Sequence, residues 1–412
     1  MTSEGARREE ILGTAASLFA SSGIRTSLKE IGDACGILPG SLYHHFESKG
    51  AIVVELVQRY RDELDAIAKG ALDSLHEPGP TGVEQRVVDL GEAIAAAGIR
   101  HRAALLLTLY EPPTTASDVL VDLARHTSSA VAEAMAAILE AGRSAGEIRP
   151  EVDTTLLGHR ICQSMLHVGV GVFHRSRAAR HLPTTKCRVF LHGLATRPPA
   201  ASTLDRSAPM RAARAVIASW HHGEGDDRSA HLRAIGRTEF ARRGFEATTM
   251  RDVAKAAGLS TGTVYRTYPS KDDLLVAIMS TFAESMNAAW DDVLTAGGTP
   301  VERLDALMWV NINVLDRFSD EFKIALAWMR QEPPDSGELR LSFGQDLRRL
   351  QDLIVEGEEV GRFHVLDGSA RTRARTMYEL ILTPDNVIRA GGLDAALELA
   401  RQTVLRGALV AR

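Results

Sequence analysis

"GSLYHHFESKG" (residues 40–50) and "GTVYRTYPSKD" (residues 262–272) repeat one order of residue types, 222 positions apart. Each reads glycine, a small hydroxyl residue, an aliphatic residue, tyrosine, two polar residues and an aromatic residue, with Ser-Lys soon after. The agreement reaches back to Phe19 in the first copy and Phe240 in the second. A match of this length indicates that the chain contains an internal duplication.

Each copy predicts short helices joined by a tight turn. Ser27 and Glu30 have the spacing of a capping box, in which each side chain satisfies a free backbone N–H group. Thr249 and Asp252 hold the same places in the second copy. A helix is therefore expected to begin directly after Ser27 and after Thr249.

The next helix of each copy is expected to protrude. Ser260 caps it in the second copy, whereas Leu38 stands at the cap position of the first, followed by Pro39. One apolar pair at i, i+4 spacing is expected to anchor this helix to the core, Leu42 and Phe46 in the first copy and Val264 and Tyr268 in the second. The remaining polar side chains point outward, where they can enter a DNA major groove. A branched side chain in place of Gly262 is expected to crowd the turn between the two helices.

The stretch "GFEATTMRDVAKAAGLSTGTVYRTYPSKDDLL" (244–275) resembles the DNA-binding domain of the TetR/AcrR family of bacterial transcriptional repressors. The first copy resembles it too, with Ile24 for the turn phenylalanine and Leu38-Pro39 for Ser-x. The resemblance covers about 50 residues in each half. It implies an all-α chain of two tandem TetR-like units, each a helix-turn-helix domain followed by a helical ligand-binding and dimerisation domain.

The resemblance also implies DNA contacts. Backbone contacts near the start of the second helix are expected from Ser27, Lys29, Thr248, Thr249 and Arg251. Phosphate contacts are expected from Tyr43, Lys49, Tyr265 and Lys271, and base-edge contacts from Ser41, His44, Thr261, Thr263 and Arg266. Arginine reads guanine bidentately and histidine does so less well, so the two units should prefer different half-sites.

Local charge differs between the copies, although the whole chain carries a net charge of −5. Residues 228–271 contain nine basic and three acidic side chains, a net +6, whereas residues 7–49 contain five of each. Because attraction to phosphate is largely Coulombic, the second copy should supply more of the affinity for DNA.

Composition shifts and breaks suggest five segments. They are the first DNA-binding domain (1–50), the first helical domain (51–197), a linker rich in Pro, Ala and Ser (198–223), the second DNA-binding domain (224–272) and the second helical domain (273–412). Within the linker, residues 211–222 have the composition of a helix.

The helical domains are expected to bind a small effector. Candidate lining residues are Leu106, Met165, His167, Trp309 and Trp328, with plain core packing as the alternative for each. The first copy is similar to TetR-like regulators of lipid and sterol breakdown, which implies an apolar or acyl-type effector. His159, His167 and His174 lack the i, i+4 pair used by helical metal sites, so no metal is expected.

A chain with two reading heads can form internally the dimer that TetR-like proteins usually make from two chains. The terminal helices, around 152–174 with 181–195 and around 369–383 with 392–410, would then pack together. A homodimer carrying four heads is the alternative assembly. The alternative function is a TetR-like protein that has lost DNA binding in one or both halves and acts as an interaction or ligand-sensing module.

Other function classes lack support in the sequence. No catalytic, nucleotide-binding or zinc-protease motif occurs, so we expect no enzyme and no cofactor. The three cysteines are too few and too scattered for a disulfide framework. No apolar run approaches the ~20 residues that cross a bilayer, so a cytoplasmic protein is expected, with double-stranded DNA and a small effector as its partners.

Overall fold

The computed structural model describes residues 3–22, 26–75, 82–108, 129–170, 181–220, 227–245, 248–328, 337–383 and 385–410. These residues form helices and their connections, and within these ranges the one isolated β-bridge joins Ala195 and Phe363. The predicted all-α class is therefore confirmed. The chain divides into two compact units, Met1–Cys187 and Arg188–Arg412.

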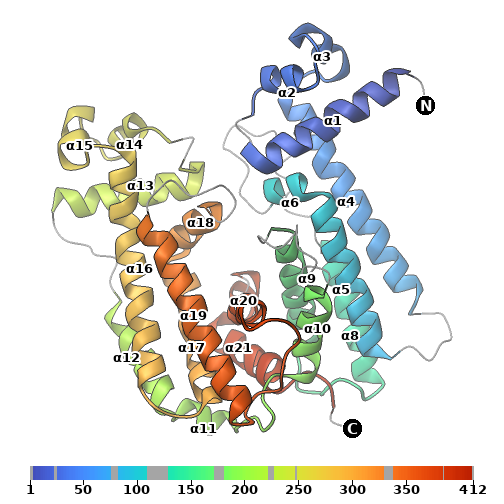
Figure 1. Ribbon diagram of the computed structural model, residues 1–412, viewed down its shortest axis with the longest axis vertical. Helices are drawn as coiled ribbons and strands as arrows, with labels where there is room; N and C mark the ends of the chain where they lie inside the picture. The colour runs from blue at the N-terminus through green and yellow to red at the C-terminus, as the bar shows by residue number, and fades with distance from the viewer. Residues whose placement is uncertain are drawn as a thin grey trace. The chain divides into compact units, whose positions relative to one another are not determined.

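The first unit places α1 and the two short helices α2 and α3 at one end of the long helix α4 (Figure 1). We call α1–α3 head one. The helices of this unit are α1 (Ser3–Ser22), α2 (Leu28–Ala34), α3 (Pro39–His45), α4 (Lys49–Asp73), α5 (Val83–Arg100), α6 (Arg102–Thr108), α8 (Ser129–Ser144) and α9 (Thr154–Val170). The boundary between the units falls within α10 (Leu182–His192).

The core of the first unit follows from the apolar stripe of α4. Ile52, Leu56 and Leu64 recur on the one face of α4 that is buried. Helix α9 packs against α5 and α8, which both pack against α4. A Cβ on Gly169 would lie 2.7 Å from the carbonyl carbon of Gly98, so α9 and α5 meet almost backbone to backbone.

The second unit repeats this plan. We call α13–α15 head two, and Figure 1 shows it at one end of the long α16. The helices are α11 (Ala201–Asp205), α12 (Ala208–Ser219), α13 (Arg228–Arg243), α14 (Met250–Ala256), α15 (Thr261–Thr267), α16 (Lys271–Thr295), α17 (Pro300–Arg317), α18 (Ser319–Trp328), α19 (Gly337–Glu359), α20 (Ala370–Ile381), α21 (Asp385–Ala400) and the π-helical turn η4 (Arg401–Leu405).

Much of the segment expected as a linker is folded into the second unit. Helix α12 packs against both α16 and α17, and it buries Met210, Ala213 and Ile217 at helical spacing. Trp220 at its end is also buried and lies 5.3 Å from Phe318, centroid to centroid. Residues 208–220 therefore contribute to the hydrophobic core of this unit.

Inside the second unit, the ends of the two sequence repeats bond to each other reciprocally. The amide N–H groups of Leu194 and Ala195 donate to the carbonyl oxygens of Val404 and Leu405, at 2.8 and 3.0 Å. In return, Ala408 and Leu409 donate to Phe190 and Leu191, at 3.0 and 2.8 Å. The four residues near the end of the first repeat correspond to four residues near the end of the second, each 214 positions later: Phe190 to Val404, Leu191 to Leu405, Leu194 to Ala408 and Ala195 to Leu409. We call this set of contacts the glycine joint.

Two glycines make this approach possible. Gly193 (φ +77°) and Gly407 (φ +83°) each end a helical segment, through N–H bonds to Val189 and Thr403. A Cβ on Gly193 would lie 2.5 Å from the carbonyl carbon of Arg406, and one on Gly407 would lie 2.2 Å from that of His192. The backbones are therefore too close for any side chain at either position.

Candidate nucleic-acid interface

In head one, a capping box fixes the start of α2, the helix that precedes the exposed helix α3. The Ser27 hydroxyl accepts a bond from the Glu30 amide at 3.2 Å, while the Glu30 carboxylate accepts one from the Ser27 amide at 2.6 Å. The predicted capping box is confirmed. The backbone and hydroxyl bonds from Ser27 hold the pKa of Glu30 below its usual value.

The protruding helix α3 is anchored as the spacing predicted. Leu42 and Phe46 are buried, while Ser41, Tyr43 and His44 on the same helix are exposed. Its cap position is unusual, because Leu38 makes no side-chain cap bond. Helix α3 thus presents its polar residues outward, as a recognition helix requires.

Head two has the same geometry with a complete set of caps. The Thr249–Asp252 capping box is confirmed, and the Ser260 hydroxyl accepts from the Thr263 amide at 3.2 Å. Bonds from the Thr249 hydroxyl and amide lower the pKa of Asp252. Val264 and Tyr268 anchor α15 in an apolar core that includes Leu274 of α16.

The residues of head two that are predicted to contact base edges lie together on α15. Arg266 is exposed, and Thr261 and Thr263 are half-buried; Tyr265, which is predicted to contact phosphate, is exposed on the same helix. The Arg266 guanidinium donates to the Thr263 hydroxyl at 3.2 Å, which holds both side chains on one face of the helix.

Two of the predicted DNA contacts of head two, Thr248 and Lys271, have partners within that head. Thr248 is buried, and its hydroxyl donates to the Gly244 carbonyl oxygen at 2.9 Å, so it packs inside head two rather than reaching the surface. The Lys271 ammonium donates to the Phe245 carbonyl oxygen at 2.9 Å and lies 4.2 Å from the centre of the Phe245 ring, so it braces the turn. Lys49, its counterpart in head one, is half-buried.

The space around Gly262 differs from the expectation that a side chain there would crowd the turn between the two helices. A Cβ built on it meets no atom within 4 Å, and Gly40 in head one is equally open. Both glycines lie in the first turn of their helices and are exposed, so neither is required by the crossing of the two helices.

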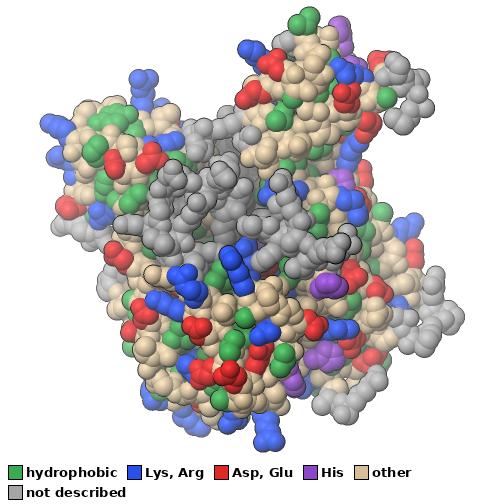
Figure 2. All heavy atoms as spheres, viewed as in Figure 1, with side chains coloured by type: hydrophobic (Ala, Val, Ile, Leu, Met, Phe, Trp, Pro, Cys, Tyr) green, Lys and Arg blue, Asp and Glu red, His purple; other side chains and the backbone are tan. Residues whose placement is uncertain are grey.

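Exposed charge at aligned positions differs sharply between the heads. Head two presents Arg251, Lys255 and Arg266. The aligned residues of head one are Lys29, Asp33 and His44, also exposed. With histidine neutral, these positions carry +3 in head two and zero in head one. In the view of Figure 2, basic side chains stand at the edge of head two, and both heads also show acidic groups.

Several other basic residues of head two are paired within the protein. Arg242 and Arg243 both bind the Glu239 carboxylate, at 2.8 Å. Arg237 pairs with the buried Glu321 of α18 at 3.3 Å. Glu239 is already counted in the net +6 of residues 228–271, whereas Glu321 lies outside this segment and lowers the charge that is available to DNA. Much of the exposed charge lies at Arg251, Lys255 and Arg266.

The candidate effector residues lie within the helical domains. Leu106 on α6 and His167 on α9 are half-buried, and α6 packs against α9. Met165 is fully buried, with its sulfur 3.9 Å from the Cys187 sulfur, as in ordinary core packing. Trp309 is half-buried on α17. Trp328 ends α18, and its side chain lies outside the described part of the chain, as does His174.

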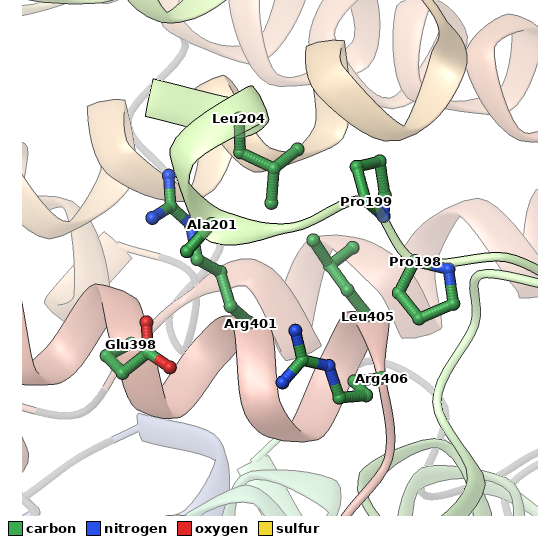
Figure 3. Close-up of a pocket in the computed structure, with 8 residues that line it drawn as sticks. All are labelled: Pro198, Pro199, Ala201, Leu204, Glu398, Arg401, Leu405 and Arg406. Atoms are coloured by element: carbon green, nitrogen blue, oxygen red, sulfur yellow. The ribbon is translucent and has the colours of Figure 1, made fainter. Parts of the chain in front are cut away.

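A shallow pocket adjoins the glycine joint (Figure 3). Its lining residues are Pro198, Pro199, Ala201, Leu204, Glu398, Arg401, Leu405 and Arg406. The Arg401 guanidinium binds Asp305 through two bonds of 2.8 Å and Asp205 through one of 2.9 Å. Because Arg401 is already neutralised by these carboxylates, we assign it the role of tying α11 to α17 rather than that of holding a ligand.

Neither a metal-binding cluster nor a membrane-spanning helix occurs among the described residues. No three His, Cys, Asp or Glu side chains in these ranges are arranged as metal ligands. None of the helices within them is both long and apolar enough to span a bilayer.

Comparison with known proteins identifies the heads. The family model for "Bacterial regulatory proteins, tetR family" matches residues 11–56 and again residues 233–278. The HTH-type transcriptional repressor KstR2 of Rhodococcus jostii (strain RHA1) is 35% identical over 156 residues, which are 36% of this chain and 72% of that protein. The chain belongs to the TetR family of bacterial regulatory proteins.

Other known proteins are also similar to parts of this chain. The repressor KstR of Mycolicibacterium smegmatis is 43% identical over 65 residues, which are 16% of this chain and 32% of that protein. A solved structure titled as the ketosteroid transcriptional regulator KstR2 of Mycobacterium tuberculosis has a TM-score of 0.38 at 24% identity, covering 44% of this chain and 92% of that one. This TetR-family chain is therefore a DNA-binding transcriptional regulator, and it carries the family's DNA-binding domain twice.

Proposed function

We propose that this chain is an effector-controlled repressor that reads an asymmetric double-stranded operator with two unlike heads, and that head two supplies the larger share of the affinity. The observation that carries this proposal is the exposed charge at aligned positions, +3 at Arg251, Lys255 and Arg266 against zero at Lys29, Asp33 and His44. Each phosphate that a basic side chain neutralises adds about 0.9 to the slope of log K against log salt. Head two should therefore dominate both affinity and salt dependence.

The reading residues should differ as well. Arg266 on α15 has the donor geometry to bind the O6 and N7 atoms of guanine together. His44, at the aligned place on α3, offers one ring nitrogen at a time to a base edge. An operator with two different half-sites follows from this difference.

The glycine joint supports the further proposal that the two repeats pair as an internal pseudo-dimer. The reciprocal bonds of the glycine joint, each related to another by 214 positions, have the pattern of an isologous interface, in which residue i contacts j and j contacts i. Fusion makes this pairing intramolecular and frees the two heads to diverge.

Effector control would act through α6 and α18, which contact the heads. The Arg102 guanidinium of α6 donates to the Ala20 carbonyl oxygen of α1 at 2.9 Å, and Arg237 of α13 pairs with Glu321 of α18. Movement of either helix would displace the head that it contacts. The apolar, half-buried side chains of Leu106 and Trp309 favour an apolar or acyl-type effector.

The aligned pair Arg266→Ala and His44→Ala tests this proposal. The probe is a duplex enriched from a random-sequence library by the full-length chain. Arg266→Ala should weaken binding by about 1–3 kcal/mol and relax sequence preference in one half-site. His44→Ala should cost less and act on the other half-site. Equal losses of affinity in the two variants would contradict the dominance of head two. If the footprint over one half-site is the same in both variants as in the parent chain, the result would favour the alternative that one head no longer binds DNA.

A further inference from the structure

Leu38 is exposed at a position where an apolar side chain has no structural benefit. It stands at the N-cap of α3 with 77% of its surface exposed, and it forms no cap bond. Leucine is among the weakest N-cap residues, because it offers no oxygen to the free amides of the first turn. Its solvent exposure also contributes nothing to the core of head one.

The aligned residue in head two shows the ordinary solution. The Ser260 hydroxyl accepts from the Thr263 amide and lies 2.8 Å from the Thr263 hydroxyl. The side chain of Ser260 is thus engaged in capping α15. Leu38, by contrast, extends into solvent from the start of a recognition helix.

The start of a recognition helix is the part that meets base edges in helix-turn-helix proteins. Of the groups that bases present in the major groove, the 5-methyl of thymine is the apolar one. We propose that Leu38 reads this methyl group, so that the half-site of head one contains a thymine recognised by van der Waals contact. Head two, with Ser260 at this place, lacks this contact. The inference rests on the proposed DNA binding by head one.

Deoxyuridine isolates the contact, because it differs from thymidine by the methyl group alone. In the duplex enriched by the full-length chain, each thymine is replaced in turn, and binding is measured by fluorescence anisotropy. One replacement in the half-site of head one should weaken binding about fourfold, the equivalent of ~0.8 kcal/mol for one buried methyl group. The ratio should not change with salt, unlike the effect of a lost phosphate contact.

Leu38→Ser places the residue of head two in head one and restores a capping hydroxyl, so it should fold at least as well as the parent. This variant should bind the thymine and deoxyuridine duplexes equally. Ser260→Leu is the reciprocal variant, and it should gain a response to deoxyuridine in the half-site of head two.

Two results would overturn the inference while leaving the proposed function intact. One is sequence-specific binding with no sensitivity to deoxyuridine in the half-site of head one. The other is a sensitivity that Leu38→Ser retains. Absence of sequence-specific binding by the parent chain would defeat the proposed function, and this inference with it.

Discussion

Replacing Gly193 with alanine should damage the glycine joint severely. The residue has φ +77°, which costs a non-glycine residue about 1–2 kcal/mol. Its new Cβ would also lie 2.5 Å from the Arg406 carbonyl carbon and 2.5 Å from the Leu405 carbonyl oxygen. These are backbone atoms and cannot rotate away as a side chain would, so overpacking adds about 1–3 kcal/mol. The free energy of unfolding should fall by about 2–5 kcal/mol in total.

A matched control separates strain from collision. Gly297 has the same φ of +77°, but a Cβ there meets no atom within 4 Å. Gly297→Ala should therefore cost about 1–2 kcal/mol, from backbone strain alone. Gly407→Ala should behave like Gly193→Ala, since its Cβ would lie 2.2 Å from the His192 carbonyl carbon.

Urea denaturation, followed by tryptophan fluorescence, measures the loss in unfolding free energy for the second unit, which contains the joint. The four tryptophans are Trp220, Trp290, Trp309 and Trp328, and all belong to the second unit. Their emission therefore reports the unfolding of the unit that contains the joint. Equal losses in Gly193→Ala and Gly297→Ala would show that the reciprocal contact does not form.

Two further substitutions test charged residues, one on head one and one in the core of the second unit. Asp33→Lys gives head one the residue type that Lys255 supplies in head two, so the slope of log K against log salt should steepen by about 0.9 if one phosphate contact is gained. DNA titrations from low to high salt measure this slope, and an unchanged slope would show that α2 of head one does not contact DNA. Burial raises the pKa of Asp346 to about 7, so the folded state holds its proton more tightly than the unfolded chain does. Its stabilising contribution is present at low pH and is lost as pH rises from about 4 through about 7. Asp346→Asn, which resembles the protonated form, should flatten this decline and raise the free energy of unfolding at pH 8 by on the order of 1–3 kcal/mol; a variant with the parent's pH profile would contradict the assignment.

Local features of the fold were predictable from the sequence because they depend on neighbours in the chain. The capping boxes at Ser27 and Thr249 involve residues three positions apart, and the anchors Leu42 and Phe46 are four apart. The duplicated helix-turn-helix pattern followed from such short-range spacing, and the all-α class followed from the resemblance to the TetR/AcrR family. Exposure of Tyr43, Tyr265 and Arg266 followed from the same periodicity.

Features that depend on distant contacts were not predictable. The Pro-rich start of residues 198–223 suggested a linker, yet the spacing of Met210, Ala213 and Ile217 matches a face buried by α16 and α17. The glycine joint pairs residues that are 210 or 218 positions apart, and its one sequence signal is a glycine after the last helical segment of each repeat. Lys271 fits a DNA-contact motif, while its partner, the Phe245 carbonyl oxygen, lies 26 positions away in the chain and is visible in three dimensions alone.

The central claim is that one chain reads one operator with two unlike heads. Native mass spectrometry of the complex between the full-length chain and its enriched duplex tests it most directly. We predict one 44.6 kDa chain per duplex, with both half-sites protected in a footprint of the same complex. Two chains per duplex, each protecting one half-site, would contradict the internal pseudo-dimer and the asymmetric reading that follows from it.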